Sequence, residues 1–167
     1  MFDPALLAHA TGLQAQLRAQ HFTLVTAESC TGGLIAGLFT EIAGASDVID
    51  RGFVTYSNDA KMALLGVPAS TLASVGAVSR ETAIAMADGA LARAGANRAG
   101  SIAIAVTGVA GPGGGSAEKP VGLVHIAAAR TGHSTRHREC RFGDIGRHEV
   151  RIATVAAALD LIAEMMA

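Results

Sequence analysis

The chain has 167 residues, which is enough for one domain with a hydrophobic core of ordinary size. Half of the residues are hydrophobic and 16% are charged, which excludes a disordered chain. The net charge of −1 gives no general attraction to nucleic acid, and the sequence has no basic stretch interleaved with aromatic residues.

Sequence features also predict where the protein is found. The longest apolar stretch, around residues 102–106, is far shorter than the ~20 residues that a membrane-spanning helix needs. The N-terminus lacks the basic segment, apolar run and small-residue cleavage site of a signal peptide. We therefore expect a cytoplasmic protein that does not bind membranes.

In the first part of the chain, hydrophobic periodicity predicts alternating helices and strands. The predicted helices cover residues 4–20, 34–42, 57–65 and 79–94, and the predicted strands cover residues 22–25 and 48–56. Ser57 and Ser79 are expected to cap the third and fourth helices. Gly44, Gly66 and Gly95 are expected to end the second, third and fourth.

The second part of the chain begins with a strongly apolar strand. Residues 101–108 form this strand and lead into a glycine-rich loop at 109–116. Two further strands, 121–130 and 134–142, are joined at residues 131–133 as a hairpin, and a helix follows at 147–166. The second hairpin strand carries several arginines, which suits the edge of a sheet.

This order of elements predicts the fold class. We expect a single three-layer α/β domain over residues 1–167, with a mixed sheet, helices on both faces, and a C-terminal hairpin followed by a helix.

The segment that joins the first predicted strand to the following helix is dense in reactive groups. Ser29, Cys30 and Thr31 supply two hydroxyls and a thiol at the sheet edge where open α/β folds bind ligands. Gly32 and Gly33 leave the first N–H groups of the helix open to a ligand. The alternative is a turn whose polar residues only cap the helix, for example through Thr31.

A second group of residues follows the next strand. If the strands ending at Glu28 and Tyr56 are neighbours, then Tyr56, Lys61 and Ser29 meet at one edge of the sheet. A lysine that is partly desolvated loses its proton more readily and can then activate a serine hydroxyl. From spacing alone, an exposed lysine and an ordinary strand tyrosine remain the alternative.

A third group suits an anion. Thr107 and Gly108 lead into the glycine-rich loop, which includes Gly111 and exposes backbone N–H groups to a phosphate or carboxylate. The loop matches neither the nucleotide phosphate loop nor the dinucleotide-binding motif, so a plain turn remains the alternative. Arg147 and Arg151 share one face of the last helix and suit a phosphate, unless both are simply solvated.

Neither cysteines nor histidines indicate a metal or redox site. Cys30 and Cys140 are the only cysteines, and their spacing neither requires nor excludes a disulfide. His133 and His137 are four residues apart on a predicted strand, without an acidic partner at a matching offset. We expect no metal and no cofactor.

Four segments match the pattern of one known family, in order along nearly the whole chain. They are residues 27–33, residues 52–58 with Lys61, residues 76–79, and residues 107–112 continued by 119–122. The sequence resembles the carboxy-terminal domain of the CinA competence/damage-inducible protein family, which also occurs alone as nicotinamide mononucleotide (NMN) deamidase.

The resemblance implies an activity and a set of roles. It implies hydrolysis of the carboxamide of NMN to nicotinic acid mononucleotide and ammonia, in pyridine nucleotide salvage. Ser29 is implied as the nucleophile, Lys61 as its base, and Tyr56 as the residue that relays the proton or holds the lysine. For physical reasons we expect N–H groups at or near Gly32 and Gly33 to hold the oxyanion, at the positive end of the helix.

The resemblance also implies a binding pocket for a pyridine mononucleotide. Thr107 and the glycine loop, with Gly108 and Gly111, are expected to line it together with residues 30–33. The family has Phe, Pro, Gly, Asp and Arg in succession before its last helix, whereas residues 142–147 here are Phe-Gly-Asp-Ile-Gly-Arg. Either Arg147 or Arg151 therefore meets the phosphate. Many relatives carry an additional amino-terminal nucleotide-binding domain, which the resemblance does not include. We therefore expect no pyrophosphatase activity of the kind attached to that domain.

Two alternatives to a serine amidohydrolase stay open. One is a non-catalytic nucleotide-binding module in a competence or DNA-damage response assembly. The other makes Cys30 the nucleophile, since a thiol next to the serine is intrinsically reactive. The alanine-rich helices and the apolar composition also predict a homo-oligomer.

Overall fold

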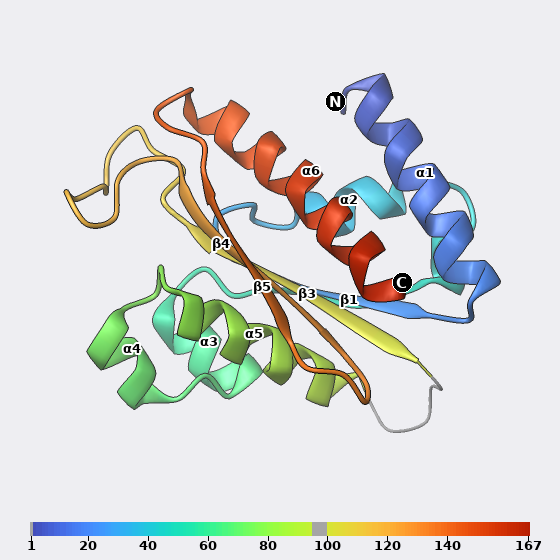
Figure 1. The fold of residues 1–167 in the computed structure, drawn as a ribbon, viewed down its shortest axis with the longest axis horizontal. Helices are drawn as coiled ribbons and strands as arrows, with labels where there is room; N and C mark the ends of the chain where they lie inside the picture. The colour runs from blue at the N-terminus through green and yellow to red at the C-terminus, as the bar shows by residue number, and fades with distance from the viewer. Residues whose placement is uncertain (1, 95–99) are drawn as a thin grey trace.

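The computed structural model describes residues 2–94 and 100–167 (Figure 1). The α-helices are α1 (Pro4–Ala19), α2 (Leu34–Thr40), α3 (Asn58–Leu65), α4 (Ala69–Val75), α5 (Arg80–Arg93) and α6 (Arg147–Met166). The strands are β1 (Thr23–Glu28), β2 (Ile49–Val54), β3 (Ser101–Gly108), β4 (Leu123–Arg130) and β5 (Arg136–Arg141). A short 3-10 helix, η1 (Ala45–Asp47), precedes β2.

The strands form one mixed sheet in the order β2-β1-β3-β4-β5. Strand β1 runs parallel to both β2 and β3, whereas β3, β4 and β5 pair antiparallel. The predicted mixed sheet and C-terminal hairpin are confirmed. Because β1, β2 and β3 are parallel, the loops that follow them emerge at the same edge of the sheet.

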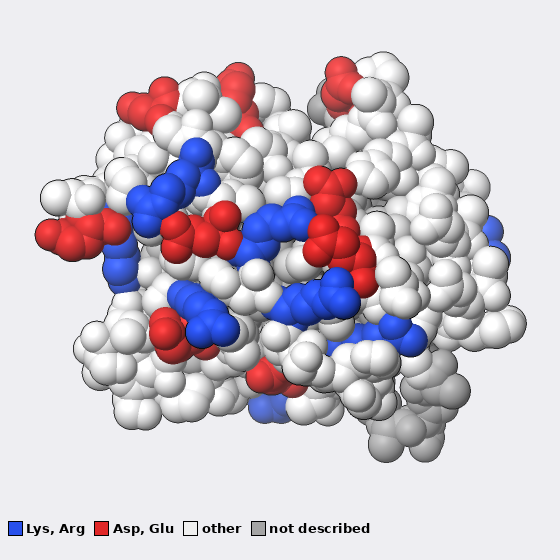
Figure 2. All heavy atoms as spheres, in the orientation of Figure 1, with Lys and Arg blue, Asp and Glu red and all other residues white. Residues whose placement is uncertain are grey.

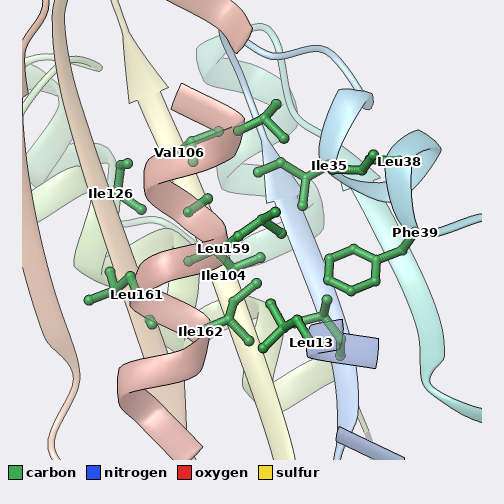
Figure 3. Close-up of a cluster of buried hydrophobic side chains, with 14 of the residues drawn as sticks. Leu13, Ile35, Leu38, Phe39, Ile104, Val106, Ile126, Leu159, Leu161 and Ile162 are labelled. Carbon is green, nitrogen blue, oxygen red and sulfur yellow. The ribbon is translucent and has the colours of Figure 1, made fainter. Parts of the chain in front are cut away.

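Helices cover both faces of the sheet, as predicted. Figure 1 shows α1, α2 and α6 on one face and α3, α4 and α5 on the other. Successive residues of β3 pack on opposite faces of the sheet. Ile104 packs in the cluster with α1, α2 and α6, and Ala105 packs in the cluster with α5. Figure 3 shows the larger cluster, in which Leu159 and Ile162 of α6 lie over the sheet.

The second layer is built from small residues. Ala103, Ala105, Ala127 and Ala129 of the sheet are buried in one cluster with Ala83, Ala87 and Ala90 of α5. Small side chains on both sides let α5 pack closely on the sheet, which explains much of the alanine content of the chain.

Three of the expected helix ends are confirmed, whereas the expected stop at Gly44 is wrong: α2 ends at Thr40 with Glu41 as its C-cap, and Gly44 is instead the N-cap of η1. The Ser57 hydroxyl accepts the N–H of Ala60 at 3.0 Å, and that of Ser79 accepts the N–H of Thr82 at 3.2 Å. Gly66 ends α3 in the left-handed conformation, with φ +70°. The expected stop at Gly95 lies outside the described residues. Helix α4 was not predicted, because only Leu72 among its seven residues is buried and the segment has little periodicity.

Strand β5 lies at an edge of the sheet, as expected from its arginines. Figure 2 shows acidic and basic side chains interspersed on the face that includes it. Arg138 forms an ion pair with Glu164 of α6, and Arg141 pairs with Glu139 within the strand. In the described part of the chain, no helix is both long and apolar enough to cross a membrane.

Candidate active site

Ser29 follows β1 directly, and Thr55 and Tyr56 follow β2. The two strands are in register up to Glu28 and Val54, and the N–H of Thr55 donates to the carbonyl of Glu28 at 2.9 Å. The residues after the two strands therefore lie side by side at the carboxyl edge of the sheet. Helix α3 starts two residues after Tyr56 and brings Lys61 back toward the same point.

Lys61 and Ser29 meet as the sequence predicts. The Nζ of Lys61 lies 3.0 Å from the Oγ of Ser29 and donates to the carbonyls of Thr55 at 2.8 Å and Tyr56 at 3.4 Å. The three acceptors match the three N–H groups of a charged ammonium, and a neutral amine can instead give two N–H groups to the carbonyls and accept the serine hydroxyl with its lone pair.

Burial weakens the affinity of the Lys61 amine for its proton. Lys61 is only 1% exposed, and desolvation by burial lowers the pKa of its amine below the ordinary 10.5. Among the residues that the structure describes, no ion pair involves Lys61. The site therefore shifts the protonation equilibrium of this amine toward the uncharged form, which is the form that can take a proton from a serine.

Tyr56 lies at the same sheet edge as Ser29 and Lys61, as expected, but its hydroxyl is bonded to another residue. Tyr56 is 60% exposed, and its hydroxyl accepts a hydrogen bond from Nη2 of Arg147 at 3.0 Å. Only the backbone carbonyl of Tyr56 approaches Lys61. The phenol thus forms the rim of the site with Arg147. The Lys61 amine is held by the backbone carbonyls of Thr55 and Tyr56.

Residues 29–33, here named the serine turn, are organised by Glu28. This carboxylate is fully buried and accepts the hydroxyl of Thr31 at 2.7 Å and the N–H of Gly33 at 3.0 Å. It also accepts the N–H groups of Ile35 at 3.0 Å and Ala36 at 2.9 Å. The positive start of α2 is therefore occupied by the protein's own carboxylate.

This arrangement corrects two expectations. The N–H of Gly33 is bound to Glu28 and that of Gly32 donates to the carbonyl of Ser29 at 3.1 Å, so neither is free for an oxyanion. Thr31 does not cap α2, because Gly33 is the N-cap residue and the Thr31 hydroxyl donates to Glu28 instead. The sequence signal for this role is an acidic residue a few positions before the start of a helix.

A cavity of about 290 Å³ opens beside the Ser29–Lys61 pair. Its lining residues are Ser29, Cys30, Tyr56, Lys61, Ala77, Val78, Thr107, Gly108, Val109, Ala110, Gly111, Gly113, Gly114 and Arg147. The lining thus includes the expected Thr107, Gly108 and Gly111. Thr31, Gly32, Gly33 and Arg151 lie outside it.

One wall of the cavity was not assigned from the sequence. Ala77 and Val78 come from the connection between α4 and α5, and the Thr107 hydroxyl donates to the carbonyl of Ala77 at 2.8 Å. This bond fixes the connection against the end of β3. Their apolar side chains carry no chemical signal, and the match of residues 76–79 to the family pattern was the signal that could have found this wall.

The two arginines of α6 have different partners. Arg147 donates through Nη1 to the carbonyl of Gly111 at 2.7 Å and lines the cavity. Arg151, one turn later, donates to the carbonyls of Cys30 at 3.1 Å and Thr31 at 2.7 Å. Arg147 therefore faces the space that a ligand would fill, and Arg151 holds the serine turn.

The thiols are poor candidates for chemistry. Cys30 is 5% exposed, and burial raises the pKa of its thiol to about 12, so the thiolate is disfavoured. Cys30 and Cys140 are free thiols, so no disulfide joins them. No group of three or more metal-ligating side chains occurs within residues 2–94 and 100–167.

Fold and site together define an open α/β domain with a buried Ser–Lys pair at the carboxyl edge of its parallel strands, an arrangement suited to acyl transfer. The family model described as the CinA C-terminal domain matches residues 7–166, and the chain belongs to this family.

Named relatives differ in how much of their length they share with this chain. The nicotinamide-nucleotide amidohydrolase PncC of Escherichia coli (strain K12) is 45% identical over 163 residues, covering 97% of this chain and 95% of that protein. A competence-damage inducible protein of Caldicellulosiruptor bescii is 53% identical over 137 residues, but the match covers only 32% of its length. The chain thus spans about a third of some relatives and nearly all of others.

Solved structures of the family have the same fold. The crystal structure of the competence/damage inducible protein CihA from Agrobacterium tumefaciens superposes with a TM-score of 0.93 at 54% sequence identity. The superposition covers 98% of this chain and 97% of that one.

Proposed function

We propose that this protein is an amidohydrolase that converts NMN and water to nicotinic acid mononucleotide and ammonia. The main support for this proposal is the buried Lys61 amine, which lies 3.0 Å from the Ser29 hydroxyl at the wall of a cavity. The near full-length likeness to a relative named nicotinamide-nucleotide amidohydrolase supports the choice of substrate.

The proposed reaction has two stages. The Oγ of Ser29 attacks the carboxamide carbon while Lys61 takes the hydroxyl proton, which gives a tetrahedral intermediate. The C–N bond then breaks as Lys61 returns this proton to the departing nitrogen, so that ammonia leaves and an ester to Ser29 remains. Water then attacks the ester carbon and gives a proton to Lys61. The bond between this carbon and the Ser29 Oγ breaks as Lys61 returns the proton to the oxygen, so that the carboxylic acid leaves and the site is restored.

The cavity lining suggests how the nucleotide is oriented. Arg147 is the cation that lines the cavity, and we assign the substrate phosphate to its guanidinium. Thr107 and the glycines of the following loop enclose the rest of the nucleotide, with Tyr56 at the rim. The apolar walls at Ala77 and Val78 suit a flat pyridine ring.

The test is release of ammonia from NMN by the purified protein, with nicotinic acid mononucleotide identified as the second product. Ser29→Ala and Lys61→Met should both lose the activity, while wild type turns over repeatedly. If wild type binds NMN tightly and releases no ammonia, the protein is a nucleotide-binding module and the proposal is wrong. Full activity in either variant would contradict the assigned roles.

The remaining expectations complete the proposal. We propose that residues 1–167 act as one amidohydrolase domain, in the cytoplasm, as a homo-oligomer and without direct contact to nucleic acid. The interspersed charges around β5 support the last point, since nucleic-acid binding needs a basic surface (Figure 2).

A further inference from the structure

The serine turn is bound on two sides by side chains of opposite charge. Glu28 precedes the turn and accepts the Thr31 hydroxyl and the N–H of Gly33. Arg151 comes from α6, some 120 residues further along the chain, and donates to the carbonyls of Cys30 and Thr31. In addition, the N–H of Ser29 donates to the carbonyl of Val106 on β3 at 3.0 Å.

These contacts leave the turn little freedom. A Cβ added at Gly32 would lie 3.6 Å from Nη2 of Arg151, so the guanidinium packs directly against the turn. Lys61 is anchored separately, through the carbonyls of Thr55 and Tyr56. The distance between the serine hydroxyl and the lysine amine therefore depends on how firmly the turn is held against the rest of the molecule.

We propose that Glu28 and Arg151 are positioning residues that hold the serine turn from its two sides, Glu28 through hydrogen-bond donors and Arg151 through carbonyls. Neither residue lines the cavity, so neither touches the substrate. Their part is to keep Ser29 within reach of Lys61, and a misplacement of ~1 Å costs roughly 10²-fold in rate. Only the kinetic test of this inference rests on the proposed function.

The first test uses the thiol inside the turn as a reporter. Cys30 is only 5% exposed and burial raises the pKa of its thiol to about 12, so its alkylation by iodoacetamide is slow and should become faster when the turn opens. In a Cys140→Ser background, Arg151→Met should raise the alkylation rate by about tenfold. The matched control is Arg138→Met, because Arg138 also donates to a backbone carbonyl, that of Ala157 at 3.3 Å, outside the site.

This test decides the inference even if the protein releases no ammonia from NMN. Faster alkylation in Arg151→Met than in Arg138→Met, at equal temperature below both melting points, supports the inference. Equal rates would overturn it. If Arg151→Met does not fold, Arg151→Lys takes its place, since lysine keeps the charge but lacks the two-pronged donor.

The second test separates positioning from substrate binding. Arg151→Lys and Glu28→Gln should each lower kcat for NMN by roughly 10²-fold with little change in KM. Millimolar guanidinium should partly restore kcat in Arg151→Ala, whereas sodium chloride at the same ionic strength should not. A raised KM with unchanged kcat would instead make Arg151 a substrate-binding residue, and unchanged kcat and KM would show that the turn needs no such support.

Discussion

Lys61 gives the clearest link between burial and chemistry in this molecule. Its amine lies in the interior without an acidic partner among the described residues, and desolvation lowers its pKa. A lysine in such a place costs stability while it is charged, and it becomes a usable base for the same reason.

This cost predicts a pH dependence of stability. Since the pKa of Lys61 is lower in the folded state than in the unfolded state, the unfolded chain binds more protons between the two values. The unfolding free energy of wild type should therefore rise, relative to Lys61→Met, as the pH increases from the lowered pKa toward 10.5. Urea unfolding of both proteins across this range measures the difference; a constant difference would show that the lysine titrates normally.

Replacing Arg147 should selectively weaken the binding of a substrate that carries a phosphate. Replacing it with Met removes the cation that lines the cavity, so KM for NMN should rise by roughly 10-fold or more, in keeping with the loss of a charged hydrogen bond. KM for nicotinamide riboside, which has no phosphate, should change little. Equal effects on the two substrates would assign the phosphate to another residue.

At the scale of elements, α3, which carries Lys61, packs against α5. Gly89 of α5 permits this contact, because a Cβ there would stand 1.9 Å from the carbonyl oxygen of Leu65. Any side chain at position 89 pushes the end of α3 away from α5. The glycine is therefore needed for the close packing of the helix that carries Lys61.

We predict that Gly89→Ala destabilises the protein by about 1–3 kcal/mol, as overpacking in a close contact usually does, and lowers kcat as well. The matched control is Gly12→Ala in α1, where nothing lies within 4 Å of the added Cβ. That change should be neutral or stabilising by up to about 1 kcal/mol, because alanine favours a helix. Thermal and urea unfolding measure both; similar effects of the two changes would contradict the close contact.

The elements also show what sequence patterns can predict here. Helix α6 and the β4–β5 hairpin have long, regular patterns, and their predictions are confirmed. The short helix α4 buries a single leucine and gave no periodic signal. Residues of the serine turn were assigned to the ligand from their chemistry, but their N–H groups and carbonyls are bound by Glu28 and Arg151. Which arginine of α6 faces the cavity depends on a tertiary contact that spacing alone does not contain.

At the scale of the whole molecule, topology assembles the site. Parallel pairing of β1 with β2 and β3 brings Ser29, Tyr56 and Thr107 to one edge, and α6 adds Arg147 from the end of the chain. Because the rim residue Tyr56 is 60% exposed and nearby Val54 is 51% exposed, this edge also offers apolar surface for self-association.

If the protein self-associates, its mass in solution is a multiple of the mass of one chain. Sedimentation equilibrium at micromolar concentration should give a dimer or larger assembly of the 16.8 kDa chain. Tyr56→Ser and Val54→Ser should weaken the assembly if this edge takes part. A wild-type monomer over the whole concentration range would contradict the oligomer.

The pH dependence of kcat/KM for ammonia release tests most directly whether a neutral Lys61 amine activates Ser29. We predict that the rate rises with pH through one ionisation lying below 10.5, and that Lys61→Arg, which stays charged, loses this rise together with most of the activity, roughly 10²–10⁴-fold. A wild-type rate that does not depend on pH, or a Lys61→Arg variant with the same profile, would contradict the account.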